Sequence, residues 1–215
     1  MTTYYYGNNN SDNILIQMVG DHEIPMLSNE VDIIKELTGA DDFRLLAIKV
    51  DDWNLELSPW HAPAVFGKED FGGHGSDSLN KVLEIIYNEI LNEFDRSKLH
   101  IYIGGYSLSG LFALWSVYQT DMFDGVAAAS PSVWYPGFDE YTYDNNIKTS
   151  AVYMSLGDKE SKTRNPIMAQ VSDKIQEIYK FLDAKIDVKF EWNEGNHFKE
   201  PDVRIAKAFA WLLRR

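Results

Sequence analysis

A serine, a histidine and two carboxylates are arranged along this chain in an order that could perform nucleophilic chemistry. Ser107 lies in a turn rich in glycine and serine, residues 104–110 (GGYSLSG). His197 is the only histidine downstream of Ser107. Between them, two acids, Asp158 and Glu160, closely follow the apolar run 151–156. An activated serine needs a base, and the base needs a carboxylate that orients it. The pattern therefore predicts Ser107 as a nucleophile and His197 as its base.

The turn around Ser107 has the small residues that a strained strand-to-helix turn requires. Gly105 lies two positions before Ser107, Ser109 lies two positions after it, and Gly110 comes next. A helix N-terminus beneath Ser107 would favour a developing negative charge, and we expect the backbone N–H of Leu108 to be one donor to the oxyanion. The alternative is that Ser107 merely caps the helix in a glycine-rich turn.

Short apolar runs alternate with longer amphipathic stretches along the chain, which predicts alternating strands and helices. The predicted strands are residues 14–19, 44–50, 100–104, 125–129, 151–156 and 186–192. The predicted helices are residues 30–37, 79–94, 108–119, 167–182 and 201–213. This alternation implies right-handed crossovers and a mainly parallel sheet of about six strands or slightly more, with helices on both faces. The last strands are nearly continuous in apolar residues, so we expect them to be buried on both faces.

Each candidate residue follows a predicted strand, which is where ligands bind in open α/β sheets. The loop after the first strand reads Val19-Gly20-Asp21-His22. Gly20 lets the backbone approach a ligand, so the N–H of Asp21 is the candidate second oxyanion donor, with an ordinary turn as the alternative. Because no second histidine lies at ligand spacing from His22, we expect a solvated loop histidine and no metal site.

Two loops, residues 51–63 and 71–75, are rich in aromatic residues, proline and glycine and are too long for simple connections. Functional loops often have this character. Trp53, Trp60 and Phe71 could line a substrate pocket, or they could be aromatic residues packed beneath a long loop.

Composition limits the partners, the cofactors and the location. The 215 residues suit one domain over 1–215, and the absence of cysteine excludes a cysteine nucleophile or a cysteine-ligated metal. A formal net charge of −13 disfavours nucleic acid and anionic membranes as partners. The first residues lack a secretory signal pattern, and no apolar run reaches the ~20 residues of a membrane span. We therefore expect a cytoplasmic protein, either a monomer or a homo-oligomer.

Four segments together resemble an esterase family of α/β-hydrolases that includes siderophore (enterochelin-type) esterases, S-formylglutathione hydrolases and feruloyl esterases. They are residues 105–114 (GYSLSGLFAL), 129–134 (ASPSVW), 157–160 (GDKE) and 195–197 (GNH). The resemblance runs over roughly residues 100–213. It implies an α/β-hydrolase fold. The chain departs from the family pattern at Tyr106, where many relatives have histidine, and at Ser109, where they have glycine.

The resemblance also implies roles for particular residues. Many hydrolases carry the acid three residues after the loop glycine, which favours Glu160, while Asp158 remains the alternative and could instead hold the turn. In such relatives the Ser-Pro-Ser-x-Trp stretch borders the active site, which implies that Trp134 lines the substrate pocket here. We expect Tyr106 beside it in that pocket. The short chain is expected to lack the first antiparallel strands of larger hydrolases and to have a minimal lid.

The implied reaction is hydrolysis of a small-molecule carboxylic ester, or a thioester, through an acyl-enzyme. A Ser-His-acid triad would perform it with no metal or organic cofactor. Two alternatives stay open. One is acyl transfer to an acceptor other than water, and the other is a non-catalytic binding protein with the same fold.

Overall fold

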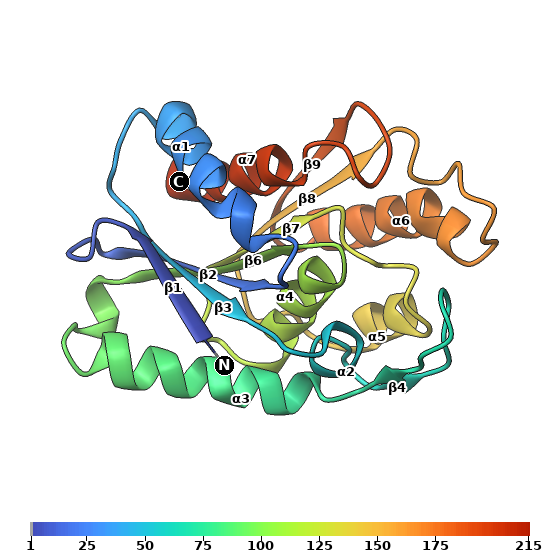
Figure 1. Ribbon diagram of the computed structural model, residues 1–215, viewed down its shortest axis with the longest axis horizontal. Coiled ribbons are helices and arrows are strands. Elements are labelled where there is room, and N and C mark those ends of the chain that lie inside the picture. Colours follow the sequence, from blue (N-terminus) through green and yellow to red (C-terminus); the bar gives the residue numbers. More distant parts are fainter. Residues whose placement is uncertain (1) are drawn as a thin grey trace.

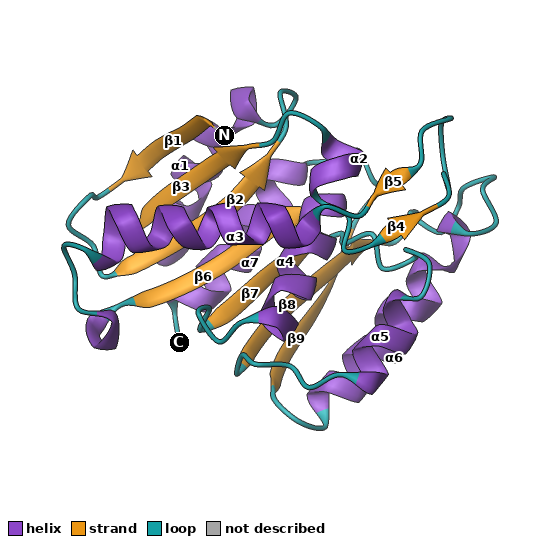
Figure 2. Ribbon diagram, turned by 90° about the horizontal axis from the view of Figure 1, so that it is seen from below, coloured by secondary structure: helices purple, strands orange, loops and turns teal. Residues whose placement is uncertain are grey.

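The computed structural model describes residues 2–215 as a central sheet with helices on both faces (Figure 1, Figure 2). Within these residues the sheet has seven strands in the order β1-β3-β2-β6-β7-β8-β9. The strands are β1 (Thr2–Gly7), β2 (Asn13–Val19), β3 (Arg44–Lys49), β6 (His100–Tyr106), β7 (Gly125–Ala129), β8 (Ala151–Gly157) and β9 (Asp187–Asn193). All neighbouring pairs are parallel except β1 with β3, which confirms the predicted mainly parallel sheet.

Helices α1 and α7 cover one face of the sheet, and α3, α4 and α6 cover the other (Figure 1). The helices are α1 (Leu27–Thr38), α2 (Trp53–Glu56), α3 (Gly75–Ile86), α4 (Leu108–Gln119), α5 (Phe138–Asp144), α6 (Val171–Asp183) and α7 (Pro201–Leu213). A π-helical turn, Tyr87–Leu91, extends α3, and short 3-10 turns lie at Ile24–Met26, Arg96–Lys98 and Met168–Gln170. No helix in the described part of the chain is long and apolar enough to span a membrane.

The two edge strands correct two expectations from the sequence. β1 pairs antiparallel with β3, so the chain does have an initial antiparallel strand, which we expected it to lack. Its residues (TTYYYG) are partly exposed, and a half-solvated edge strand does not need the apolar run by which buried strands are recognised. β9 forms the other edge and is only partly buried, because no strand lies beyond it.

The loop between α2 and α3 contains a small separate hairpin, β4 (His61–Ala62) with β5 (Phe71–Gly72). It lies beside α2, at the same end of the molecule as the carboxyl ends of the parallel strands (Figure 2). The long aromatic loops of the sequence thus fold as a small cover rather than as a separate lid.

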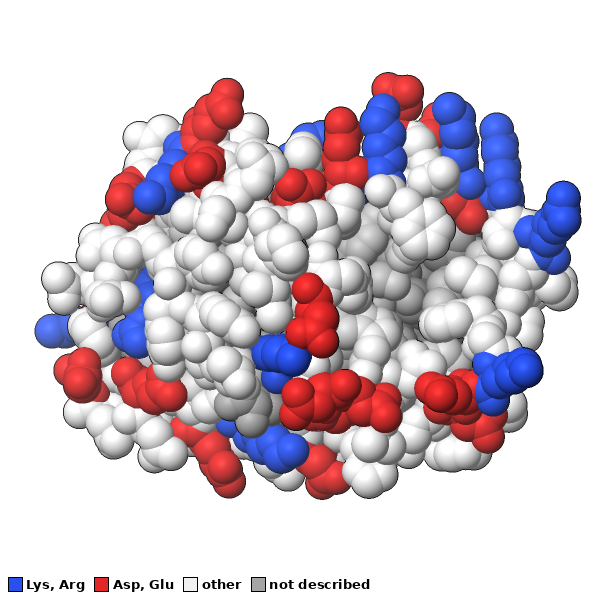
Figure 3. Space-filling view, viewed as in Figure 1, with Lys and Arg blue, Asp and Glu red and all other residues white. Residues whose placement is uncertain are grey.

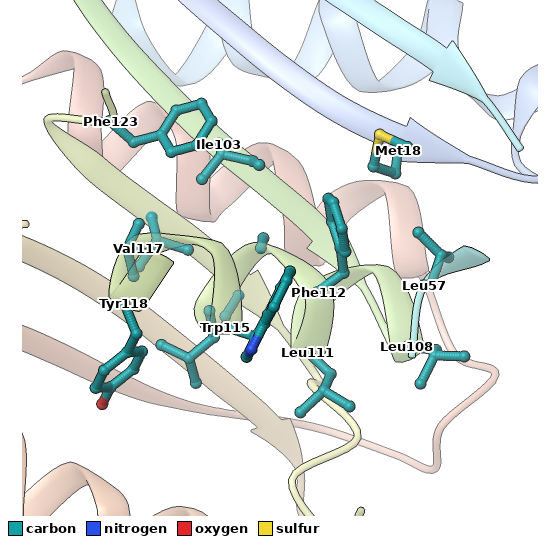
Figure 4. Packing of buried hydrophobic residues seen from close by; sticks show 14 of the residues in the cluster. Met18, Leu57, Ile103, Leu108, Leu111, Phe112, Trp115, Val117, Tyr118 and Phe123 are labelled. Atoms are coloured by element: carbon teal, nitrogen blue, oxygen red, sulfur yellow. The ribbon is translucent and has the colours of Figure 1, made fainter. Parts of the chain in front are cut away.

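Helix α4 is buried along its length from Leu108 to Tyr118. Figure 4 shows Phe112 pointing from α4 toward the sheet, while Leu111 and Tyr118 point to the opposite side. Such a helix cannot shift without disturbing close-packed neighbours, so its N-terminus has a fixed position. Ser107 immediately precedes this N-terminus and is therefore held by the core itself.

Candidate active site

Ser107, His197 and Glu160 form a continuous chain of hydrogen bonds at the carboxyl ends of β6, β9 and β8. The Oγ atom of Ser107 lies 2.9 Å from Nε2 of His197. The Nδ1 atom of His197 lies 2.7 Å from Oε2 of Glu160. This order matches a nucleophile, a base and an orienting acid, so the imidazole can accept the serine proton while the carboxylate fixes its tautomer.

Asp158 holds the turn after β8, which was the alternative to a role as the acid. Its Oδ1 accepts a hydrogen bond from the N–H of Gly195 over 2.7 Å, and its own N–H donates to the carbonyl of Asn193 over 2.8 Å. These two bonds tie the loop after β8 to the end of β9 and its following loop. Of the two candidate acids, Glu160 is therefore the one that contacts His197.

The backbone of Ser107 adopts an unusual conformation, with φ 59° and ψ −121°. Such conformations cost on the order of 1–3 kcal/mol and persist only where the surroundings impose them. Here the N–H of Ser107 donates to Ala129 over 3.2 Å, and its carbonyl accepts from Leu111 and Ser132 at 3.0 Å each. A Cβ atom at Gly105 would lie 2.0 Å from Oγ of Ser109, so this position requires glycine. The strained turn of the motif is thus present.

Ser109, which departs from the family glycine, is accommodated by a hydrogen bond. Its Oγ donates to the carbonyl of Met18 on β2 over 2.7 Å. A buried hydroxyl is tolerated when it finds such a partner. The substitution therefore ties the nucleophile turn to the neighbouring strand without removing an atom from the Ser107 site.

Arg204 on α7 contacts the acid from the side opposite His197, and sequence reasoning missed it. Its Nη1 donates to Oε1 of Glu160 over 2.8 Å, and only 2% of its side chain is exposed. Its Nη2 donates to the carbonyls of Glu194 (3.2 Å) and Asn196 (3.0 Å) in the loop that carries His197. One guanidinium therefore holds both the acid and the loop of the base.

Two more donors surround the carboxylate of Glu160. Oε1 also accepts from Oγ of Ser130 and from the N–H of Gly157, at 2.7 Å each. Burial alone would raise the pKa of Glu160, but hydrogen bonds and charge from His197, with the bonds from Gly157 and Ser130, outweigh it and lower the pKa. The carboxyl is therefore ionised at neutral pH, as an acid that stabilises an imidazolium must be.

Tyr106, a candidate pocket residue, lines the cavity and also contacts His197. Its hydroxyl donates to the backbone carbonyl of His197 over 2.7 Å and accepts from Nη1 of Arg204 at 3.1 Å. Burial, followed by the charge of Glu160, raises the pKa of Tyr106 to about 12. The phenol is thus neutral and acts as a hydrogen-bonding strut.

The two candidate oxyanion donors lie at the ends of neighbouring strands. Leu108 is the first residue of α4, so its N–H has no acceptor within that helix. The carboxylate of Asp21 pairs with Lys49 over 2.8 Å, while Oε2 of Glu23 accepts from the N–H of Gly20 over 2.8 Å. The N–H of Asp21 bonds to no other residue among 2–215. Both roles stay predictions.

A cavity of about 580 Å³ opens at Ser107. Figure 3 shows the hollow on this face of the molecule, with mostly uncharged, white walls. Trp53, Trp134 and Tyr106, the candidates for the substrate pocket, line it, and His22 also lines it, with its ring 5.3 Å from that of Trp53. The remaining lining residues are Glu23, Met26, Phe66, Ser107, Met168, His197, Phe198 and Pro201.

Trp60 does not line this cavity, contrary to expectation. Its ring packs against Tyr135 and Tyr141, and its indole N–H donates to the carbonyl of Pro136 over 3.0 Å. Phe71 is fully buried behind Phe66. The alternative of aromatic packing beneath a loop therefore holds for these two residues, since Phe71 in β5 is fully buried and Trp60, directly before β4, is partly buried against the core.

Comparisons with known proteins agree with this geometry at the level of fold. No family model matches the chain. The uncharacterized protein YbbA of Bacillus subtilis (strain 168) is 25% identical over 182 residues, covering 78% of this chain and 72% of that protein.

Several solved structures share the architecture at low sequence identity. An IroE-like serine hydrolase from Shewanella oneidensis matches with a TM-score of 0.75 at 12% identity, covering 99% of this chain and 75% of that one. The siderophore hydrolase EstA from Aspergillus nidulans gives 0.68 at 18%, covering 96% and 84%. The Bacillus cereus carboxylesterase gives 0.65 at 17%, covering 100% and 94%. The chain thus has the α/β-hydrolase fold, as the resemblance implied.

Proposed function

We propose that this chain, as a single α/β-hydrolase domain over residues 1–215, is a serine esterase that hydrolyses small-molecule carboxylic esters or thioesters. The observation that supports this most is the contact between Oγ of Ser107 and Nε2 of His197, 2.9 Å, on a strained turn that opens into a cavity. Glu160 completes the set of roles that nucleophilic acyl transfer requires.

In the proposed reaction His197 accepts the proton of Ser107 as Oγ attacks the acyl carbon. The N–H groups of Leu108 and Asp21 would stabilise the oxyanion, and such a donor contributes about 3 kcal/mol in comparable sites. His197 then protonates the leaving alkoxide or thiolate, which leaves an acyl group on Ser107. Water, deprotonated by His197, attacks this acyl-enzyme, and the acid product leaves.

The fold neighbours support the esterase class from a separate direction. Their names describe a siderophore hydrolase, a carboxylesterase and a serine hydrolase. A binding protein that kept only the fold would be expected to have lost at least one of the three triad roles. Here all three side chains are in hydrogen-bonding contact, which favours catalysis over binding alone.

Labelling by a fluorophosphonate at neutral pH tests the nucleophile directly. We expect stoichiometric labelling of Ser107 in the native protein and none in Ser107→Ala or His197→Ala. A panel of p-nitrophenyl esters, S-formylglutathione and a catecholate siderophore then tests turnover, and product analysis with added alcohols separates hydrolysis from acyl transfer. A folded protein with no label and no turnover would point to a binding protein of this fold.

A further inference from the structure

We infer that the cavity at Ser107 selects esters that carry a cationic group, such as a quaternary or protonated amine, and that the carboxylate of Glu23 binds this group. The inference rests on the proposed esterase function, since the cavity is the one into which Ser107 opens. It names a substrate class and a specificity-determining residue for that reaction.

Glu23 lines the catalytic cavity, and one of its two carboxylate oxygens has no hydrogen-bond partner among residues 2–215. The residue is only 6% exposed and lines both this cavity and a small adjoining recess. Its Oε2 accepts from the N–H of Gly20 over 2.8 Å. Its Oε1 has no hydrogen-bond partner among residues 2–215 and is not sealed from solvent. Both oxygens of a buried carboxylate normally have hydrogen-bond partners, so the unpaired Oε1 of Glu23 is a candidate ligand-binding atom.

No basic side chain neutralises this carboxylate. The cavity lining contains no lysine or arginine, and the adjoining recess is lined by two more acids, Glu30 and Asp202. Two lysines near the loops that flank the cavity in sequence are paired with other acids: Lys49, at the end of β3, with Asp21 over 2.8 Å, and Lys199 with Glu194 over 3.4 Å. Above about pH 7, where Glu23 is ionised, a cation entering the cavity would therefore meet a negative charge that no basic side chain lining the cavity offsets.

The other walls also favour a cation. Trp53, Phe66 and Trp134 line the cavity, and the rings of Phe66 and Trp134 meet edge to face with centroids 5.9 Å apart. Aromatic faces attract ammonium groups, and quaternary amines in particular are recognised by aromatic walls. In Figure 3 most of the hollow's visible walls are white, the colour of all residues other than Lys, Arg, Asp and Glu.

The raised pKa of Glu23 agrees with a buried carboxyl group that lacks a cationic partner. Burial raises the pKa of Glu23 to about 7, and the hydrogen bond from Gly20 lowers it only in part. A bound cation would favour the ionised form and lower this pKa again. Preference for a cationic ester over a neutral one should therefore increase as the pH rises through about 7.

Other titratable groups line the cavity and its adjoining recess. They are His22, His197, Tyr106, Glu30 and Asp202. The comparison of cationic with neutral esters must cancel their effects on turnover. A group that takes part in the catalytic step itself affects the turnover of both members of a matched ester pair. The ratio of the two kcat/KM values therefore isolates the group that distinguishes a cation from its neutral isostere.

Glu23→Gln separates charge from structure. An amide oxygen can still accept the hydrogen bond from Gly20, so the loop after β2 keeps its support while the negative charge is removed. Glu84→Gln on the exposed surface of α3 is the matched control, because it makes the same chemical change away from the cavity.

Two pairs of isosteric substrates place the cation on either side of the scissile bond. Butyrylthiocholine and S-(3,3-dimethylbutyl) thiobutyrate differ in the leaving group. The p-nitrophenyl esters of 4-(trimethylammonio)butyrate and 5,5-dimethylhexanoate differ in the acyl group. In each pair a quaternary nitrogen replaces a quaternary carbon. The members also differ in intrinsic reactivity, so the readout is the change in their kcat/KM ratio between variants at pH 8.

We expect the cationic-to-neutral ratio to fall about tenfold in Glu23→Gln for at least one pair, and to stay unchanged in Glu84→Gln. Hydrolysis of the neutral esters with equal ratios in native protein and Glu23→Gln, for both pairs, would overturn the inference and leave the esterase proposal standing. No turnover together with no labelling of Ser107 would overturn both.

A measurement on the native protein alone covers the case in which Glu23→Gln does not fold. Choline and its neutral isostere 3,3-dimethylbutan-1-ol are compared as protectants of Ser107 against a fluorophosphonate. We expect choline to slow labelling at concentrations at least tenfold lower than the alcohol at pH 8. Equal protection by the two compounds, or better protection by the alcohol, would count against a cation site.

Discussion

Nη1 of Arg204 donates to Oε1 of Glu160 over 2.8 Å, while Oε2 of the same carboxylate faces Nδ1 of His197 over 2.7 Å. Both charged side chains are almost fully buried, 2% exposed for Arg204 and 4% for Glu160. The acid of the proposed triad is therefore held between two cationic or potentially cationic partners. Its position depends on α7, a helix that contributes no residue to the triad itself.

Arg204→Met should destabilise the protein strongly, because it leaves the carboxylate of Glu160 buried without its arginine. Removing one partner of a buried ion pair typically costs about 3–5 kcal/mol. Urea denaturation measures this loss, with Arg214→Met, at the exposed end of the same helix, as the control.

Arg204→Lys separates position from charge. Lysine keeps the positive charge but cannot bind Glu160 and two loop carbonyls with one planar group. We expect kcat to fall by about tenfold or more while KM changes little, since Arg204 does not line the cavity at Ser107. Unchanged kcat in a folded Arg204→Lys protein would show that the charge alone suffices.

Exchange of each acid for its amide should show unequal roles. Glu160→Gln removes the carboxylate that orients His197, and the equivalent change in a serine protease lowers kcat by about 10⁴. Asp158→Asn weakens the bond to Gly195 but leaves the triad intact, so we expect less than about a tenfold loss. Turnover of one p-nitrophenyl ester by both variants measures the contrast, and a larger loss in Asp158→Asn would reverse the assignment.

Tyr106→Phe should lower kcat through the position of His197. The change removes the hydroxyl that donates to the His197 carbonyl over 2.7 Å and that receives Arg204. Loss of one such buried hydrogen bond costs about 1–3 kcal/mol of stability. We expect kcat to fall severalfold. Tyr179→Phe on α6 serves as the control, and the two variants should differ both in kcat and in denaturation midpoint.

Sequence reasoning reached the parts of the site that depend on local pattern. Ser107 and His197 could be identified because each follows a strand, and strand ends meet at one edge of a parallel sheet. Arg204 gave no such signal, since its partner carboxylate lies 44 residues away and an arginine in a helix is usually solvated. Glu23 was likewise not identified as a cavity residue from the sequence.

For the aromatic loops, the sequence pattern could not predict which side chains line the cavity. Trp53 and Trp60 lie in one loop and have the same chemistry, yet Trp53 lines the cavity and Trp60 packs against Tyr135. In the structure Trp53 begins α2, whereas Trp60 directly precedes β4 and contacts Tyr135 and Tyr141, so tertiary contacts set the difference. β1 was missed for a related reason, since an edge strand has little apolar signal.

Glu30 should make the protein less stable as the pH rises. It is buried on α1, where Nε2 of Gln17 donates to its Oε2 over 3.3 Å. Burial above all, with the charges of Glu23 and Asp202, raises its pKa well above the usual value. Oε1 of Glu30 and Oε1 of Gln17 are both buried without a hydrogen-bond partner. If Glu30 is protonated, its O–H can donate to the side-chain carbonyl of Gln17, which satisfies both atoms.

The sign of the effect follows from where the proton is held. The unfolded chain releases the Glu30 proton near pH 4.5, whereas the folded chain keeps it to a higher pH. The folded state therefore binds more protons, and the free energy of unfolding falls as the pH rises above about 4.5. Glu30→Gln has no proton to lose and can make the same pair of hydrogen bonds with Gln17.

We expect Glu30→Gln to match the native protein in stability near pH 4 and to exceed it at pH 8, because each pH unit between 4.5 and the folded pKa of Glu30 lowers the native free energy of unfolding by about 1.4 kcal/mol. Urea denaturation at both pH values measures the difference, and it cancels titrations that the two proteins share. Glu36→Gln, on the exposed side of the same helix, should show no such pH-dependent gain. A native protein that gains stability relative to Glu30→Gln between pH 4 and pH 8 would mean that Glu30 is folded as a carboxylate with a favourable partner.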